Sequence, residues 1–175
     1  EAALLRDFDC DWALMADTCG SEHRYQRHLL RYSQALFRNQ VNYDIVSPQD
    51  DWSAYRLLIV PALLLVNETL AAKLEAYARG GGTLILTFLS GLRDSESVFI
   101  SETFPGKLRA LCGLEIEEQD NQFQYGKPAI RLLDESYAHN SANCDWWRDV
   151  LKLTTARTLA VYADAGQYTG TPAIT

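Results

Sequence analysis

The 175 residues are enough for one globular domain with a buried core, and 47% apolar with 22% charged residues exclude a disordered or fibrous chain. The net charge of −7 argues against a nucleic-acid partner, because phosphate binding needs clustered lysine and arginine. No apolar run approaches the roughly 20 residues that cross a bilayer, so no membrane partner is expected.

Strands and helices alternate through the first ninety residues. Apolar strands are predicted at Ala2–Leu5, at Tyr43–Val46, from Arg56 to Pro61 and at residues 83–88. A helix is predicted over roughly residues 22–39, because Tyr25, Leu29, Tyr32 and Leu36 fall on one face. The first strand is expected to lead into a polar loop, "RDFDCDW".

A second helix is expected after Asn67, which can cap it, and Glu75 can pair with Arg79 at i,i+4. Gly80 is expected to close this helix in the left-handed region. The strand at 83–88 is wholly apolar, which is typical of a parallel sheet with helices on both faces.

The second half is predicted to hold a short helix ending at Gly113, strands at 114–118, 128–133 and 158–163, and a helix over 144–153. No repeat or linker interrupts the chain, so one domain is expected. The alternation predicts an α/β fold, a doubly wound and mostly parallel sheet.

Two motifs resemble catalytic elements. Gly80, Gly81 and Gly82 follow a helix instead of preceding one, which is the wrong side for a phosphate loop. Ser90 follows a strand, but a nucleophile elbow needs small residues two positions away on each side, where Phe88 and Leu92 stand. The histidines that could act as a base, His23, His28 and His139, have no evident place beside it.

Three alternating acids, Asp7, Asp9 and Asp11, end the first strand. A receiver-type magnesium site would use such acids, but it also needs an acid at the end of the third strand, where Pro61 and Ala62 stand. Solvated or partner-facing loop acids are therefore favoured, and neither a metal nor a cofactor is expected. The tryptophans Trp12, Trp52, Trp146 and Trp147 fit a core or an interface equally.

The four cysteines, Cys10, Cys19, Cys112 and Cys144, are widely spaced and form no CxxC or Cys/His pattern. Free thiols in a reducing compartment are the expected state, which predicts a cytoplasmic location. The chain shows no secretory signal and opens without an initiator methionine, so a fragment of a longer protein is expected. The carboxyl ends of the predicted strands, where an α/β enzyme has its active site, carry no catalytic groups in this sequence. The chain is therefore predicted to be an interaction or assembly module.

The chain resembles the middle, trimerization domain of glycoside hydrolase family 42 β-galactosidases. The similarity lies in "DWSAYRLLIVPALLLVNETLAAKLEAYARGGGTLILTFLSGLRDSE" (51–96), in "FPGKLRALCGLEIEEQD" (104–120) and in the segment 145–175 that ends "GTPAIT". The front, "LLRDFDCDWALM", corresponds to the tryptophan motif of the family, with one Trp and an extra Asp. Residues 122–143 match least.

This resemblance implies a flavodoxin-like, class I glutamine-amidotransferase-like fold in three layers that lacks a nucleophile. It implies a single domain over 1–175 that joins three subunits, with the catalytic barrel, the C-terminal β-domain and the last strand lying outside the chain. The parent enzyme would hydrolyse terminal β-D-galactosides with two glutamates of the barrel, so none is sought here.

The loop 7–19 is expected to face a neighbouring barrel, which makes Asp7, Asp9, Asp11, Trp12 and Ser90 the candidate partner-interface residues. Two alternatives remain open. One is a stand-alone amidotransferase-like hydrolase or esterase, and the other is a sensor domain that binds Mg²⁺ or a small molecule.

Overall fold

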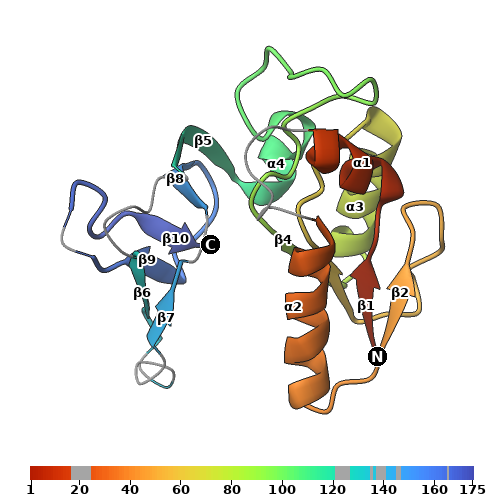
Figure 1. The fold of residues 1–175 in the computed structure, drawn as a ribbon, viewed down its shortest axis with the longest axis horizontal. Helices are drawn as coiled ribbons and strands as arrows, with labels where there is room; N and C mark the ends of the chain where they lie inside the picture. Colours follow the sequence, from red (N-terminus) through yellow and green to blue (C-terminus); the bar gives the residue numbers. More distant parts are fainter. Residues whose placement is uncertain (17–24, 121–126, 135, 137–140, 145–146, 165) are drawn as a thin grey trace. The chain divides into compact units, whose positions relative to one another are not determined.

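The computed structural model describes residues 1–16, 25–120, 127–134, 136, 141–144, 147–164 and 166–175. These residues form two compact units (Figure 1). Unit 1 comprises Glu1–Ser101 with Gly106–Leu108, and unit 2 comprises Glu102–Pro105 with Arg109–Thr175. The parallel sheet lies in unit 1, and the antiparallel sheets lie in unit 2.

Unit 1 is built on a four-stranded parallel sheet. Its strands are β1 (Ala2–Leu5), β2 (Tyr43–Val46), β3 (Leu57–Val60) and β4 (Thr83–Leu86), in the order β2-β1-β3-β4. This is the flavodoxin-like order, so the predicted α/β class and parallel sheet are confirmed. The sequence predicted the bounds of β1 and β2 correctly, and β3 ends just before Pro61, which cannot donate to a strand ladder.

Helix α2 (Tyr25–Arg38) covers the centre of one face of this sheet. Its Leu29, Tyr32 and Leu36 pack against a cluster that includes Leu4 and Ile59, and small Ala2 belongs to the same cluster. The predicted apolar face of the helix is therefore confirmed. Helix α1 (Phe8–Ala16) lies between β1 and α2 in the sequence, where a loop was predicted.

Helix α3 (Glu68–Arg79) connects β3 to β4. Asn67 caps it, since its Oδ1 accepts from the Leu70 amide at 2.8 Å, and Glu75 accepts from Arg79 at 2.7 Å. The connections β1–α2–β2 and β3–α3–β4 run in opposite directions along the strand order, so right-handed crossovers place α2 and α3 on opposite faces. The result is the expected three layers.

The end of α3 differs from the prediction. Gly80 has φ −71°, which is right-handed, and the left-handed residue is Gly81 at φ +93°. Gly80 still closes the helix, because its amide donates to Ala76 O. At Gly82 a Cβ would overlap the ring of Tyr77, so any larger residue there would displace that ring.

The apolar sequence of β4 predicted that both faces of the strand would be covered, and this prediction was wrong. The strand ends at Leu86, and its side chains alternate between exposed and half-buried. Ile85 pairs with Ile59, which pairs with Leu4, so this row faces α2. Ile85 is 41% exposed because α2 lies over β1 and β3 and leaves the sheet edges open.

Unit 1 also contains the 3₁₀ turn η1 (Gly106–Leu108), and α4 (Arg109–Cys112) follows in unit 2. Gly113 ends the predicted short helix with φ +65°, and its carbonyl accepts from the amides of Thr154, Thr155 and Ala156. Strand β5 (Leu114–Asp120) pairs antiparallel with β8 (Arg148–Leu153), with a register shift between Ile116 and Glu118.

The second sheet of unit 2 has the order β10-β9-β6-β7 and is antiparallel. Its strands are β6 (Ala129–Leu132), β7 (Ser141–Asn143), β9 (Ala160–Tyr162) and β10 (Pro172–Ile174). The predicted strands near 114, 129 and 160 are confirmed. The helix predicted over 144–153 is wrong, because residues 148–153 pair along β5 and this pairing satisfies their backbone groups.

Candidate functional site

The acids that follow β1 hold the start of α1 in place. Asp7 caps the helix, because its Oδ1 accepts from the amides of Asp9 at 2.9 Å and Cys10 at 3.4 Å. The Asp7 amide donates to the hydroxyl of Tyr25 at 2.9 Å, and this hydroxyl donates to Leu5 O at 3.3 Å. Tyr25 is fully buried, so α2 fixes the point where β1 becomes α1.

Asp11 lies one turn further along the same face of α1 and is 4% exposed. Its Oδ2 accepts from Gln26 Nε2 at 3.2 Å and lies 3.8 Å from Nη2 of Arg6. The side chains of Asp7 and Asp11 therefore make their contacts on the buried side of the helix, and the side chain of Asp9 is exposed. The loop prediction for this segment was wrong, because Asp7 supplies a cap that starts a helix there.

Cys10 is fully buried between these groups. Its Sγ accepts from the Leu65 amide at 3.4 Å and donates to Asp7 Oδ2 at 3.5 Å. Burial raises the pKa of the Cys10 thiol, and the nearby Asp7 carboxylate raises it further, so this thiol stays protonated. Cys10 is a packing residue in this geometry.

Trp12 lies on the outer side of α1 and is 63% exposed. Its ring centroid is 6.4 Å from that of Phe8, and Arg6 stands over the Phe8 ring at 4.3 Å. The other tryptophans differ: Trp52 is buried, Trp147 is half-buried and Trp146 lies outside the described residues. Among the described residues, no cluster of three His, Cys, Asp or Glu side chains could hold a metal ion.

Ser90 is 5% exposed, and its hydroxyl points into unit 1. The Oγ donates to Thr87 O at 2.8 Å and accepts from the Leu63 amide at 3.3 Å. The residue with positive φ in this turn is Leu89, at 63°, one position before the serine. Ser90 thus ties the turns after β3 and β4 together, and its Oγ does not face solvent as a nucleophile must.

The histidines do not form a base for Ser90 in the part of the chain that is described. His28 is buried and packs edge-on against Phe88, with ring centroids 4.7 Å apart. His23 and His139 lie outside the described residues. The structure therefore brings Asp7 and Asp11 together around α1, and it places Ser90 separately in the turn after β4.

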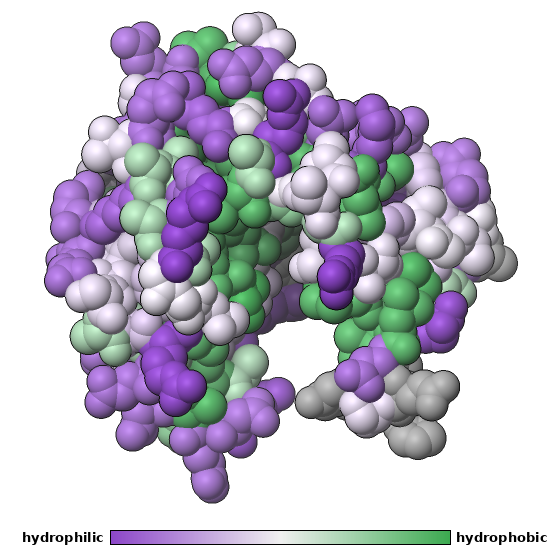
Figure 2. Space-filling model, turned by 180° about the vertical axis from the view of Figure 1, so that it is seen from behind, coloured by the Kyte–Doolittle hydropathy of each residue, from purple (hydrophilic) through white to green (hydrophobic). Residues whose placement is uncertain are grey.

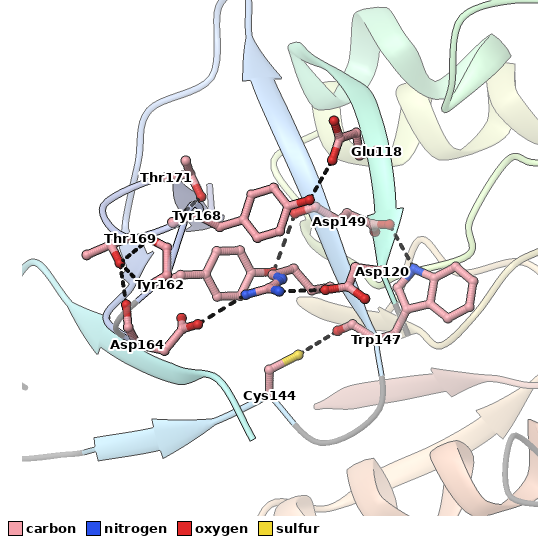
Figure 3. Close-up of polar contacts among 12 residues, drawn as sticks. Glu118, Asp120, Cys144, Trp147, Asp149, Tyr162, Asp164, Tyr168, Thr169 and Thr171 are labelled. Carbon is pink, nitrogen blue, oxygen red and sulfur yellow. Dashed lines mark hydrogen bonds and ion pairs between the residues drawn. The ribbon is translucent and has the colours of Figure 1, made fainter. Parts of the chain in front are cut away.

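A second polar cluster, missed by the sequence reasoning, lies in unit 2 around Arg148 (Figure 3). Arg148 is 7% exposed and donates to Asp120 at 2.5 Å and to Asp164 at 3.3 Å. The ring of Tyr168 lies 4.3 Å from its guanidinium, and the Tyr168 hydroxyl donates to Glu118 at 2.6 Å. Arg148 thereby connects β5, β8 and the chain after β9.

Asp149 lies beside this cluster, and Figure 3 shows it next to Trp147. Gln119 also contacts it. The Oδ1 of Asp149 accepts from Trp147 Nε1 at 2.8 Å and from Gln119 Nε2 at 3.3 Å. Burial raises the pKa of Asp149, although the two hydrogen bonds oppose this effect. The sequence did not predict the contacts of Trp147, Arg148 and Asp149, because a helix was expected over residues 144–153 and the pairing of this segment with β5 was not.

Comparison with known proteins identifies the family. The family described as the β-galactosidase trimerisation domain matches residues 1–175. β-Galactosidase GalA of Bacillus licheniformis is 33% identical over 177 residues, which cover 100% of this chain and 25% of that protein. β-Galactosidase BglY of Alicyclobacillus acidocaldarius is 30% identical over 184 residues, covering 100% and 26%. The chain thus spans about a quarter of the length of these relatives.

Solved structures agree in fold. The β-galactosidase from Bacillus circulans sp. alkalophilus matches with a TM-score of 0.90 at 29% identity, over 98% of this chain and 26% of that chain. The β-galactosidase from Halorubrum lacusprofundi matches with a TM-score of 0.89 at 26% identity, over 98% and 25%. The chain belongs to the trimerisation-domain family of glycoside hydrolase family 42 β-galactosidases, as its motifs predicted.

Proposed function

We propose that this chain is the non-catalytic, subunit-assembling domain of a homotrimeric β-galactosidase that hydrolyses terminal non-reducing β-D-galactosides. The observation that carries the proposal is the match of the trimerisation-domain family to all of residues 1–175. Because this match spans both units, units 1 and 2 together are taken as one domain. The galactoside then binds only to the catalytic barrel of the longer protein.

The partner in this proposal is a further copy of the same chain. The net charge of −7 disfavours nucleic acid. Within the described parts, no helix has the length and apolar character of a bilayer span. A cytoplasmic location is part of the proposal, and the free thiols of Cys10 and Cys112 support it.

The test uses the full-length protein. Sedimentation equilibrium should give three times the subunit mass, and the trimer should hydrolyse p-nitrophenyl β-D-galactopyranoside. A monomer at micromolar concentration, or a protein without galactosidase activity, would contradict the proposal. Labelling of Ser90 by a serine-hydrolase probe would instead favour the hydrolase alternative, for which the buried and hydrogen-bonded Oγ gives no support.

A further inference from the structure

Three large apolar side chains lie on the outer face of α1. Phe8, Trp12 and Met15 follow the spacing i, i+4, i+7, which places them on one side of the helix. They are 53%, 63% and 66% exposed, and the rings of Phe8 and Trp12 are neighbours at 6.4 Å. These three residues form what we name the apolar stripe. Figure 2 shows hydrophobic residues at the surface among hydrophilic ones on the face seen there.

The inner face of the same helix carries a buried carboxylate beside small apolar residues, Cys10 and Ala13. Asp7, Cys10 and Asp11 are buried there, and Asp11 contacts Gln26 and Arg6. An ordinary surface helix has the reverse arrangement, with apolar residues toward the core and charged residues outward. Here the carboxylates point inward and the largest apolar side chains point outward, which is the pattern of a helix that a partner covers.

The helix that carries the apolar stripe is held in place by contacts with the rest of unit 1. The Asp7 cap secures the first turn, the Leu65 amide donates to Cys10, and Arg6 stands over the Phe8 ring at 4.3 Å. A surface that is already ordered loses little conformational entropy when a partner binds. Aromatic residues and methionine are enriched in protein–protein interfaces, and the stripe consists of these types alone.

A second copy of this chain is the occupant that the observations favour. This chain has a net charge of −7, so overall charge does not attract one copy to another, and the exposed apolar stripe is a surface that can favour their contact. The family to which the chain belongs is a trimerisation domain. A closed ring of three uses heterologous contacts, so the stripe would meet a different surface of the neighbouring copy.

From these observations we infer that the apolar stripe of α1 is a subunit contact of the assembled protein, covered by a neighbouring copy. The inference rests on the proposed function and deepens it by naming the surface. It assigns Trp12 to the contact itself. Asp7 and Asp11, expected from the sequence to face a partner, take the role of orienting the stripe.

Photo-crosslinking tests which chain covers the stripe. A benzophenone amino acid replaces Trp12 in the full-length protein, and irradiation should yield covalent dimers and trimers on a denaturing gel. The matched control carries the benzophenone at Phe99, which is 56% exposed and has Arg93 over its ring at 4.3 Å, much as Phe8 has Arg6. Crosslinks from position 12 that stay within one chain would overturn the inference.

A substitution gives an independent measure. The double variant Trp12→Ala and Met15→Ala should raise the concentration at which the full-length trimer dissociates by at least about 30-fold, since truncated interface anchors weaken binding that much. The control Phe99→Ala should change it by less than about threefold, as expected for an exposed side chain outside a contact. Sedimentation velocity over a dilution series measures both.

The outcomes separate this inference from the proposed function. A wild-type protein that is not a trimer contradicts the proposed function. The inference about the stripe is wrong, and the proposed function stands, in either of two cases with a trimeric wild type. In the first, the double variant and the Phe99→Ala control both dissociate at the wild-type concentration. In the second, both variants dissociate more easily than the wild type and to the same extent. Because the stripe side chains are exposed, the circular dichroism spectrum of the double variant should match that of the wild type. If the spectra differ, the crosslinks from position 12 decide whether the stripe is a subunit contact.

Discussion

At the scale of single residues, Asp7 connects β1 to α1. Replacing Asp7 with alanine removes the acceptor for the Asp9 and Cys10 amides, and loss of a helix cap costs about 1 kcal/mol. Hydrogen exchange of the α1 amides in the full-length protein should become about fivefold faster, because exchange follows local opening. Asp7→Asn should restore most of the protection.

The control for this prediction is Asp9→Ala. Asp9 is exposed, and its side chain does not supply the cap, so exchange in α1 should stay within about twofold of the wild type. Equal effects of the substitutions at Asp7 and Asp9 would show that helix-end charge, not the cap, stabilises the start of α1.

Asp149 gives a prediction for pH. Its pKa in the folded state is raised above the usual 3.8, mainly by burial, so the folded state holds the proton more tightly than the unfolded state. Stability from this group is complete below pH 3.8 and is lost as pH rises toward the folded pKa. Asp149→Asn keeps the acceptor for Trp147 and Gln119 but does not titrate.

Thermal unfolding of full-length wild type and Asp149→Asn should therefore diverge as pH rises above 3.8, with the variant becoming relatively more stable. The comparison at several pH values between 4 and 7 isolates Asp149, because the other titrating groups are common to both proteins. Parallel profiles would show that Asp149 has the same pKa in the folded and unfolded states.

At the scale of elements, Arg148 joins three parts of unit 2. It donates from β8 to Asp120 on β5 and to Asp164 after β9. Arg148→Met leaves two carboxylates without their cation, and breaking a buried pair in this way costs about 3 kcal/mol. Hydrogen exchange should accelerate in β5, β8 and the chain after β9 together.

Lys152→Met is the matched control on the same strand. Lys152 pairs with Glu115 at 3.1 Å, but its side chain is 57% exposed, and exposed pairs contribute about 0–1 kcal/mol. Exchange in β8 should hardly change. Acceleration limited to β8 in the Arg148 variant would mean that Arg148 supports its own strand and does not connect the three segments.

Apart from α1, which was predicted as a loop, and the two-sided covering expected for β4, the elements of unit 1 were predicted from local patterns. The face of α2, the Asn67 cap and the Pro61 boundary each depend on neighbouring residues, so sequence alone specifies them. The segment 148–153 could not be predicted in this way, because its partner β5 lies about thirty residues earlier in the chain. The pairing partner, not local propensity, decides its conformation.

At the scale of the whole molecule, charge and apolar surface set the conditions for assembly. The net charge of −7 of this chain gives no overall attraction between copies, whereas exposed apolar side chains such as Trp12 and Met15 lose contact with water when a partner covers them. The trimer mass and the crosslinks from position 12 test this balance directly. Asp7, Asp9, Asp11, Trp12 and Ser90 remain predicted interface residues, and the geometry supports Trp12 most.

The sequence by itself determined the family, the parallel α/β sheet and the absence of elbow spacing around Ser90, because each follows from motifs and spacing along the chain. Only the tertiary structure decided that Asp7 and Asp11 point inward while Phe8, Trp12 and Met15 point outward. That division depends on Tyr25, Gln26 and Leu65, which contact α1 across the fold. A helix exposes whichever face its distant neighbours leave uncovered.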